Sequence, residues 1–225
     1  MSRNKPQPVT DPPDLAEIET FAAFDGDALV AGRDYRAMVF DDCRFDRSDL
    51  RELVFDSVLL RTVSLGGSRG LSLTVTDSRL TGCDLANARW TGAGLLRTEL
   101  INCRLTGFDG SEARFRHVRF VASKCDLSVF HSARFECCRF ENCDLRGADF
   151  DGADLRGTVF AGCDLTDARM HGAKLVGTDF RGAQVRGLSL ERDALRGAVI
   201  EPVQLVDFAG LLGVTVKPPD DTESL

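Results

Sequence analysis

The residues of this sequence that could carry chemistry are eight cysteines and three histidines among 225 residues. Thiolates and imidazoles are common zinc ligands, nucleophiles and general bases. Zinc-binding cysteines usually occur as CxxC pairs, and the sequence contains none. It also lacks HExxH, GxGxxG and GxxxxGK[ST], the patterns of metal and nucleotide sites. We therefore expect no catalytic residues, no metal site and no cofactor, and we expect that the protein is not an enzyme.

Five of the cysteines are separated by multiples of twenty residues: Cys43, Cys83, Cys103, Cys143 and Cys163. This spacing predicts one interior column of small buried thiols. The alternative is that neighbours such as Cys83 and Cys103 come within disulfide distance. Parallel side chains and a reducing compartment favour the thiol form.

The histidines offer one further arrangement. His131 and His171 are forty residues apart, with Asp151 midway between them. If residues twenty apart stack, the three would form a His/Asp/His column on the surface. We favour ordinary exposed polar residues over a metal site.

A period of five residues organises the elements that must position these groups. Of the 35 positions taken at every fifth residue from Tyr35 to Leu205, 32 are large and apolar. Small residues prevail two positions earlier, as in CDLRGADFDGADLRG from residue 143. Neither a helix nor a simple strand has this period. It predicts a chain that turns a corner every five residues, with glycine favoured at the corner.

This pattern resembles that of the pentapeptide-repeat proteins, A(D/N)LxG, with CDLRG, ADFDG, ADLRG and AKLVG as near-consensus copies. The resemblance covers residues 33–205. It implies an all-β fold, a right-handed quadrilateral β-helix with four pentapeptides per coil. Thirty-five units would give about nine coils and a rod roughly 40 Å long.

The only tryptophan tests the twenty-residue coil. Trp90 lies twenty residues from both Gly70 and Gly110. Because an indole needs more space than one coil spacing, we predict that Trp90 is buried between these glycines. The alternative is that both glycines mark loops.

The two ends depart from the repeat. Residues 1–32 are expected to be a flexible tail and a cap, with a short helix or strand within 14–32. Residues 202–225 are expected to form a capping helix over 202–212, ended by Gly213, and a tail. The apolar candidates for the cap or for a dimer interface are Leu205, Phe208, Leu211 and Leu212.

Charge is unevenly distributed along the chain. The net charge is −7, most of it in the two tails, so the repeat region is nearly neutral. Two charged groups are candidate interaction surfaces. The basic group is Arg97, Arg114, Arg116, Arg119, Arg134 and Arg139, and the acidic group is Asp144, Asp149, Asp151 and Asp154. Aromatic residues fall inside the predicted core, which makes base stacking and direct nucleic-acid binding unlikely as a role.

No apolar stretch is long enough to span a membrane, and the N-terminus does not resemble a secretory signal. We expect a cytoplasmic protein with no membrane partner.

The resemblance also implies a function. Qnr- and MfpA-type members of the family act on DNA gyrase and topoisomerase IV as rods with DNA-like size and charge, and many members dimerise through their C-terminal ends. It therefore implies a non-catalytic protein that binds a type II topoisomerase and forms a homodimer. The nearly neutral body and the basic group do not fit a DNA mimic. A scaffold with a different protein partner is the alternative, and direct nucleic-acid binding is a third hypothesis.

Overall fold

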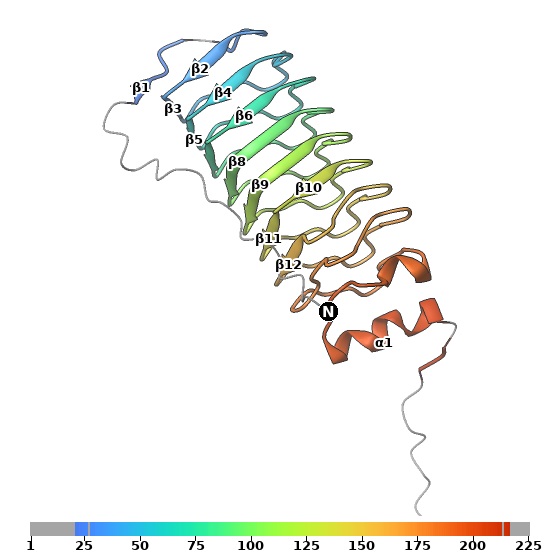
Figure 1. Ribbon diagram of the computed structural model, residues 1–225. Helices are drawn as coiled ribbons and strands as arrows, with labels where there is room; N and C mark the ends of the chain where they lie inside the picture. Colours follow the sequence, from blue (N-terminus) through green and yellow to red (C-terminus); the bar gives the residue numbers. More distant parts are fainter. Residues whose placement is uncertain (1–20, 27, 213, 217–225) are drawn as a thin grey trace, which may run out of the picture.

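The computed structural model describes residues 21–26, 28–212 and 214–216. The chain winds into a four-sided parallel β-solenoid whose coils stack along one axis, with short helices at the C-terminal end (Figure 1). From β2 onward, paired residues are twenty apart, as in Tyr35 with Phe55 and Phe55 with Val75. The fold predicted from the period of five is therefore confirmed.

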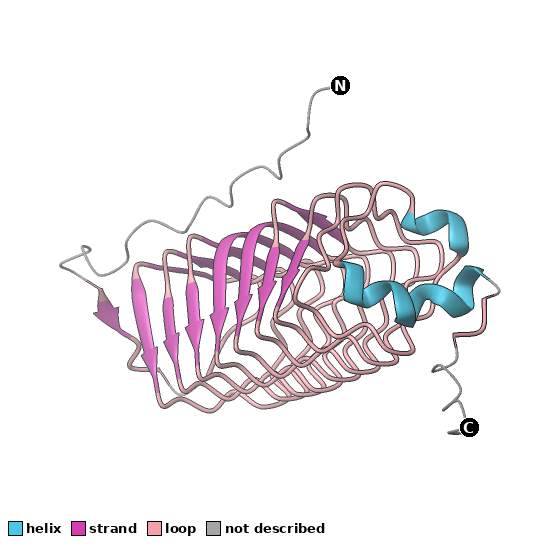
Figure 2. Ribbon diagram, turned by 90° about the horizontal axis from the view of Figure 1, so that it is seen from below, coloured by secondary structure: helices cyan, strands magenta, loops and turns pink. Residues whose placement is uncertain are grey.

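Two of the four faces carry the regular strands (Figure 2). The strands are β1 (Ala22–Ala23), β2 (Asp34–Arg36), β3 (Met38–Asp41), β4 (Val54–Asp56), β5 (Leu59–Arg61), β6 (Thr74–Thr76), β7 (Arg79–Thr81), β8 (Gly94–Ile101), β9 (Arg114–Val121), β10 (Arg134–Glu136), β11 (Arg139–Glu141) and β12 (Val159–Ala161). β8 and β9 run round the corner between the two faces. The other two faces are held by single bridges, such as Arg44 with Ser64.

The solenoid has about seven turns, slightly fewer than the nine expected. The column that begins at Asp34 makes seven steps of twenty residues and ends at Lys174. After Leu190 the regular coil is interrupted by a 3₁₀ turn, Arg192–Leu195, and the chain returns to the ladder at Val199, which bridges Asp179. Large residues still occur at every fifth position there, but Leu195 and Ile200 are only partly buried and Leu205 is exposed. The period thus continues past the end of the coils.

The core is a set of stacked side chains inside the four walls. Phenylalanines in the same inward column lie ring on ring, with centroid separations of 4.4 Å for Phe120–Phe140, 5.1 Å for Phe140–Phe160 and 5.5 Å for Phe160–Phe180. Near-parallel rings at these distances follow from the rung spacing. The interior is filled, so any function must use the outside of the rod.

Trp90 is buried, as predicted, and the two glycines have different roles. A Cβ at Gly70 would lie 2.9 Å from Trp90 Cδ1, so Gly70 provides space for the indole. The space at Gly110 is occupied by Phe108, whose ring packs edge-on against the indole at 5.6 Å. Trp90 Nε1 donates to Ser68 Oγ at 3.1 Å, which satisfies the buried N–H.

The corners require a left-handed backbone, and many are not glycine. Leu127 has a φ of 56° and its side chain is 62% exposed. An L-residue in this region costs about 1 kcal/mol or more. The Leu127 side chain therefore contributes no packing to the core, and its Cβ strains the left-handed backbone of the turn.

We expect Leu127→Gly to raise the free energy of unfolding by about 0.5–1 kcal/mol, because glycine adopts this φ without strain. Urea denaturation measures the change. Leu71→Gly is the control, since Leu71 is equally exposed and is not among the residues with positive φ. A loss of stability in Leu127→Gly would contradict the strain argument.

Both ends of the rod are closed by chain from outside the repeat. At the first coil, β1 pairs with β3, and the Phe24 ring stacks on Phe40 at 4.7 Å. Of the two alternatives for residues 14–32, the described part contains the short strand; residues 1–20 lie outside the described residues. At the last coil the chain is helical from Pro202 to Leu212, through the 3₁₀ turn Pro202–Gln204, α1 (Leu205–Phe208) and the 3₁₀ turn Ala209–Leu212. The predicted helix is confirmed; Gly213 lies outside the described residues.

Candidate interaction surface

The cysteines are interior packing residues. All eight are free thiols, and six are buried. Their thiols donate to main-chain carbonyls, as Cys103 Sγ does to Leu80 O at 3.4 Å and Cys143 Sγ to Phe120 O at 3.3 Å. Burial raises the pKa of Cys138 to about 12, so this thiol stays protonated. Within the described residues, no group of three or more His, Cys, Asp or Glu side chains could hold a metal ion.

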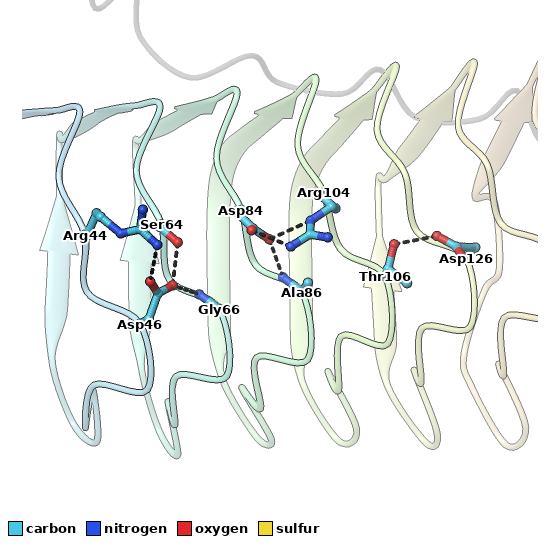
Figure 3. Close-up of polar contacts among 9 residues, drawn as sticks. All are labelled: Arg44, Asp46, Ser64, Gly66, Asp84, Ala86, Arg104, Thr106 and Asp126. Carbon is cyan, nitrogen blue, oxygen red and sulfur yellow. Dashed lines mark hydrogen bonds and ion pairs between the residues drawn. The ribbon is translucent and has the colours of Figure 1, made fainter.

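One of the two faces held by single bridges contains Arg44, Ser64 and Asp84 and is called the third face below. It carries a column of polar contacts that join one rung to the next (Figure 3). Asp46 accepts hydrogen bonds from Ser64 Oγ and, at 3.1 Å, from Gly66 N, both on the following rung. Its other oxygen lies 3.2 Å from Arg44 Nη2 on its own rung. The carboxylate thus links two rungs and is paired within the protein.

The same face continues in this way. Arg104 Nη2 lies 2.6 Å from Asp84 Oδ2, twenty residues earlier. Thr106 Oγ1 donates to Asp126 at 2.6 Å, one rung further. Both pairs are drawn in Figure 3. Side chains on adjacent rungs lie close enough for direct pairing, so the surface charges neutralise one another locally.

The predicted basic group is divided by its ion pairs. Four of its six arginines contact carboxylates: Arg97 with Asp77 at 2.6 Å, Arg116 with Glu136 at 3.6 Å, Arg119 with Glu99 at 3.0 Å, and Arg139 with Glu141 at 2.9 Å. Glu99 is only 5% exposed and also pairs with Arg79 at 2.7 Å. Arg114 and Arg134 are exposed on adjacent rungs, with no ion pair to any carboxylate of the described chain. Within the basic group, these two are the cations left available to a partner.

The predicted acidic group is paired as well. Its contacts are Asp144 with Arg146 at 2.6 Å, Asp149 with Arg169 at 3.3 Å, Asp151 with Arg169, and Asp154 with Arg156 at 2.7 Å. The hydrogen bond from Arg146 lowers the pKa of Asp144, and that from Arg156 lowers the pKa of Asp154. This region therefore presents alternating charge, not an acidic surface.

These pairs predict how stability depends on pH. Arg51 lowers the pKa of Asp49 from 3.8 to about 2, and Arg104 lowers that of Asp84. A lowered pKa in the folded state contributes stability that is complete above the unfolded value and is lost as pH falls through the folded value. We expect the urea midpoint to be constant from about pH 7 to pH 5 and to fall between about pH 4 and pH 2.

The matched variant for this pH profile carries Asp84→Asn, Asp144→Asn and Asp154→Asn together. Each substitution removes a carboxylate that an arginine holds in the ionised form. The variant should be less stable at neutral pH, and its urea midpoint should fall less steeply as the pH is lowered from about 4 to about 2. An unchanged fall would contradict its assignment to the arginine–carboxylate pairs.

One shallow hollow of about 420 Å³ lies on the outside, at the corner beyond the third face. Its lining is Asp126, Leu127, Arg146, Gly147, Thr166 and Asp167. The leucine side chain rests over Gly147, where a Cβ would lie 3.0 Å from Leu127 Cδ2. The hollow is open and mixed in character, which suits contact with a protein surface better than enclosure of a small molecule.

The C-terminal cap has a buried and an exposed side. Phe208 is buried and Leu211 is partly buried against the core, whereas Leu205 is 55% exposed. The Leu212 side chain lies outside the described residues. Val203 and Val206 are 71% and 59% exposed, and they were not among the predicted candidates. Their positions on the outer side of the helix distinguish them from Phe208.

In the column of His131, Asp151 and His171, the side chains of Asp151 and His171 contact different partners. Asp151 accepts a hydrogen bond from the main-chain N–H of His171 at 2.8 Å, and its side chain contacts Arg169. The His171 ring instead contacts Ser189, with 2.8 Å between Nε2 and Oγ, and Glu191, with 3.4 Å between Nδ1 and Oε1. The twenty-residue rule could have found this group, since Glu191 follows His171 by one coil.

Comparison with known families and structures gives a consistent picture. The family model described as pentapeptide repeats matches residues 143–182, and that described as a pentapeptide repeat region matches residues 73–150. A search of the curated proteins found no match. No described helix has the length and apolar character needed to cross a bilayer.

Two solved structures illustrate the likeness. One is trypsin-treated QnrB1, a plasmid-mediated fluoroquinolone resistance protein, with a TM-score of 0.53 and 14% identity over 82% of this chain and 100% of that chain. The other is HetL, a protein involved in heterocyst differentiation regulation from the cyanobacterium Nostoc, with a TM-score of 0.27 and 18% identity over 71% of this chain and 90% of that one. The first likeness shows a shared fold.

Proposed function

Because this chain is a pentapeptide-repeat protein, we propose that it is a non-catalytic interaction module that binds and modulates DNA gyrase or a related type II topoisomerase. The observation that carries the proposal is the continuous rod, whose fold matches that of a fluoroquinolone resistance protein along the whole of that chain. Seven turns at about 4.8 Å each give a coil stack about 34 Å long. Such a rod could lie where a topoisomerase holds a segment of duplex DNA.

The surface chemistry supports a protein partner. The flat faces carry alternating, paired charges, and the hollow at Leu127 is shallow. Exposed Arg114 and Arg134 add two cations that can meet carboxylates of a partner. Long-range attraction to DNA would require many such cations, because affinity depends on the number of phosphates neutralised.

A supercoiling assay tests the proposal. Relaxed plasmid, DNA gyrase and ATP are titrated with the protein, with and without a fluoroquinolone. Binding to the DNA-holding region predicts inhibition of supercoiling, or fewer drug-stabilised cleavage complexes, at rising protein concentration. Unchanged supercoiling and cleavage at large molar excess, with gyrase from the same source as the protein, would overturn the topoisomerase role.

A scaffold role with another protein partner is the second candidate. It is favoured by the paired charges of the acidic group, since a DNA mimic should present unpaired carboxylates. A protein that leaves gyrase unaffected but is retained by a different partner in a pull-down would support this candidate.

We also propose that a second copy of the chain covers the exposed side of the C-terminal cap. Val203, Leu205 and Val206 expose apolar surface on one short helical segment. Burying this surface against an identical copy removes apolar area from water, which favours association. Val206→Asp should shift the protein from dimer to monomer in light scattering, while Val30→Asp, an exposed valine at the other end, should not. A monomeric parent protein would refute the dimer.

A further inference from the structure

Ser189, His171 and Glu191 form a polar group at the C-terminal end of the rod, apart from the surfaces discussed above. Ser189 lies on the last regular rung, where its N–H donates to Ala168 O at 2.9 Å and its carbonyl accepts from Met170 N at 2.8 Å. His171 is on the preceding rung, and Glu191 immediately precedes the 3₁₀ turn Arg192–Leu195. The hydrogen-bonded rungs therefore fix the main chain beneath the group.

The His171 ring links the other two side chains. Nε2 is 2.8 Å from Ser189 Oγ, and Nδ1 is 3.4 Å from Glu191 Oε1. A carboxylate beside Nδ1 favours the tautomer with a proton on Nδ1, which leaves Nε2 as the acceptor. The Ser189 hydroxyl then donates to a basic nitrogen, the arrangement that activates a serine nucleophile.

Glu191 is itself held in place. Its Oε2 accepts a hydrogen bond from Gly172 N at 2.9 Å, and this contact lowers the pKa of the carboxyl group. The main-chain N–H of His171 is fixed by Asp151 at 2.8 Å. The base and the group that orients it are thus both anchored to the rungs, as a preorganised site requires.

A cation lies on the same face as the nucleophile. Arg169 pairs with Ser189 across adjacent rungs, so their side chains leave the same face of the solenoid. Its guanidinium contacts Asp149 and Asp151 through Nη2, on the rung on the other side from Ser189. Because this cation is already paired, acylation of Ser189 depends on the reactivity of the ester and not on a preformed oxyanion site.

We propose that Ser189 is a nucleophile that accepts acyl groups from small activated esters, with His171 as its general base and Glu191 as a positioning residue. Ser189 Oγ forms a bond to the carbonyl carbon while its proton passes to His171 Nε2. The tetrahedral intermediate then loses the alcohol or phenol, which leaves with that proton as the C–O bond breaks. The product is an acyl-serine, and the reaction is stoichiometric, with one acyl group bound per chain.

The exposure of the site defines the class of substrate. The His171 side chain is 48% exposed and that of Glu191 55%, so the group is open to solvent. An open surface provides little binding energy for orienting an unreactive ester. The donors it can use are therefore reactive ones with good leaving groups, of which p-nitrophenyl acetate is the simplest probe.

The experiment follows acetylation of the full-length protein by p-nitrophenyl acetate. Released nitrophenolate gives the rate, and mass spectrometry of tryptic peptides locates the acetyl group. We expect acetyl-Ser189 to form at least ten times faster than acetyl-Ser72, an exposed serine elsewhere on the rod. Ser189→Ala should abolish the fast phase, and His171→Gln should slow it about a hundredfold, as expected for loss of a general base. Ser72→Ala is the matched control.

The role of Glu191 needs a readout that a structural role would not change. Glu191→Gln should slow the acetylation of Ser189 without changing that of Ser72, and Glu191→Asp, which keeps a carboxylate, should restore part of the Ser189 rate. Thermal melts establish that the variants are folded. Equal labelling of Ser189 and Ser72, or a rate at Ser189 that His171→Gln leaves unchanged, would overturn the proposal, whether or not the protein acts on gyrase.

Discussion

Phe140→Asp is expected to abolish the folded solenoid at 25 °C. The ring is fully buried and lies between the rings of Phe120 at 4.4 Å and Phe160 at 5.1 Å. Loss of a buried phenylalanine side chain alone costs about 3–5 kcal/mol. Burial of an unpaired carboxylate adds several kcal/mol more, because the interior offers no partner for the charge. The total approaches the whole stability of a typical domain, about 5–15 kcal/mol.

Two variants make this result interpretable. Phe140→Leu keeps an apolar side chain at the same position and should lose only about 1–2 kcal/mol. Arg146→Ala changes an exposed residue whose partner is Asp144, and its effect should stay within about 1 kcal/mol. Circular dichroism and urea denaturation measure all three. Similar destabilisation by Phe140→Asp and Arg146→Ala would refute the assignment of inward and outward positions.

The consequence of Phe140→Asp depends on how a solenoid is stabilised. Each coil contacts only its neighbours, so the energy is a sum of coil and interface contributions. Phe140 lies between coils that both contribute stacked rings. A defect at this point separates the two halves of the rod, and neither half retains both of its caps. We therefore expect one broad loss of structure, with no stable intermediate that keeps only one half folded.

The fold was accessible from the sequence because one short-range rule repeats. A large residue every five positions determines which side chains point inward, and twenty residues per coil determine which of them stack. Trp90 shows how far this rule reaches. Its burial beside Gly70 follows from the spacing, but the filling of the space at Gly110 by Phe108 depends on side-chain packing, which spacing does not describe.

The end of the solenoid could not be found from the period. Leu195 and Leu205 keep the five-residue spacing, although each lies in a helical turn and not in a regular coil. Between these turns the chain returns once to the ladder at Val199, which bridges Asp179. A local pattern of large residues cannot distinguish a helical turn from a regular coil.

The surface was the least predictable part. Counting arginines and aspartates along the chain suggested a basic and an acidic surface, whereas the side chains of neighbouring rungs pair with one another. Glu99 illustrates this, since it lies between Arg79 and Arg119 and pairs with both of them. Whether two such charges pair depends on the directions of side chains that are twenty residues apart in the sequence and adjacent in the solenoid. It could be anticipated only by stacking the sequence in rows of twenty, which also brings His171 above Glu191.

Gln204→Ala is expected to detach the C-terminal cap from the last coil. Gln204 is buried, and its Nε2 donates to two main-chain carbonyls, Phe180 O and Ala183 O, at 2.7 Å each. Its Oε1 accepts from Glu201 N at 2.8 Å. Phe180 O keeps the main-chain donor Ala183 N at 2.9 Å, so the substitution removes the donor only from Ala183 O. A buried carbonyl left without a donor costs about 1–3 kcal/mol, and we expect the free energy of unfolding to fall by this amount.

Gln184→Ala is the matched control, because Gln184 is exposed on an adjacent coil and pairs through its main chain. It should change stability by less than about 0.5 kcal/mol. Hydrogen exchange locates the effect: in Gln204→Ala the amides of Phe180 and Ala183 should lose protection, while that of Phe120 should keep it. Since Phe208 packs on the same coil, the cap should open as a unit and expose its buried face. Uniform loss of protection along the rod would instead mean that Gln204 supports the whole solenoid. Normal protection at the last coil would mean that Phe208 holds the cap in place without the Gln204 side chain.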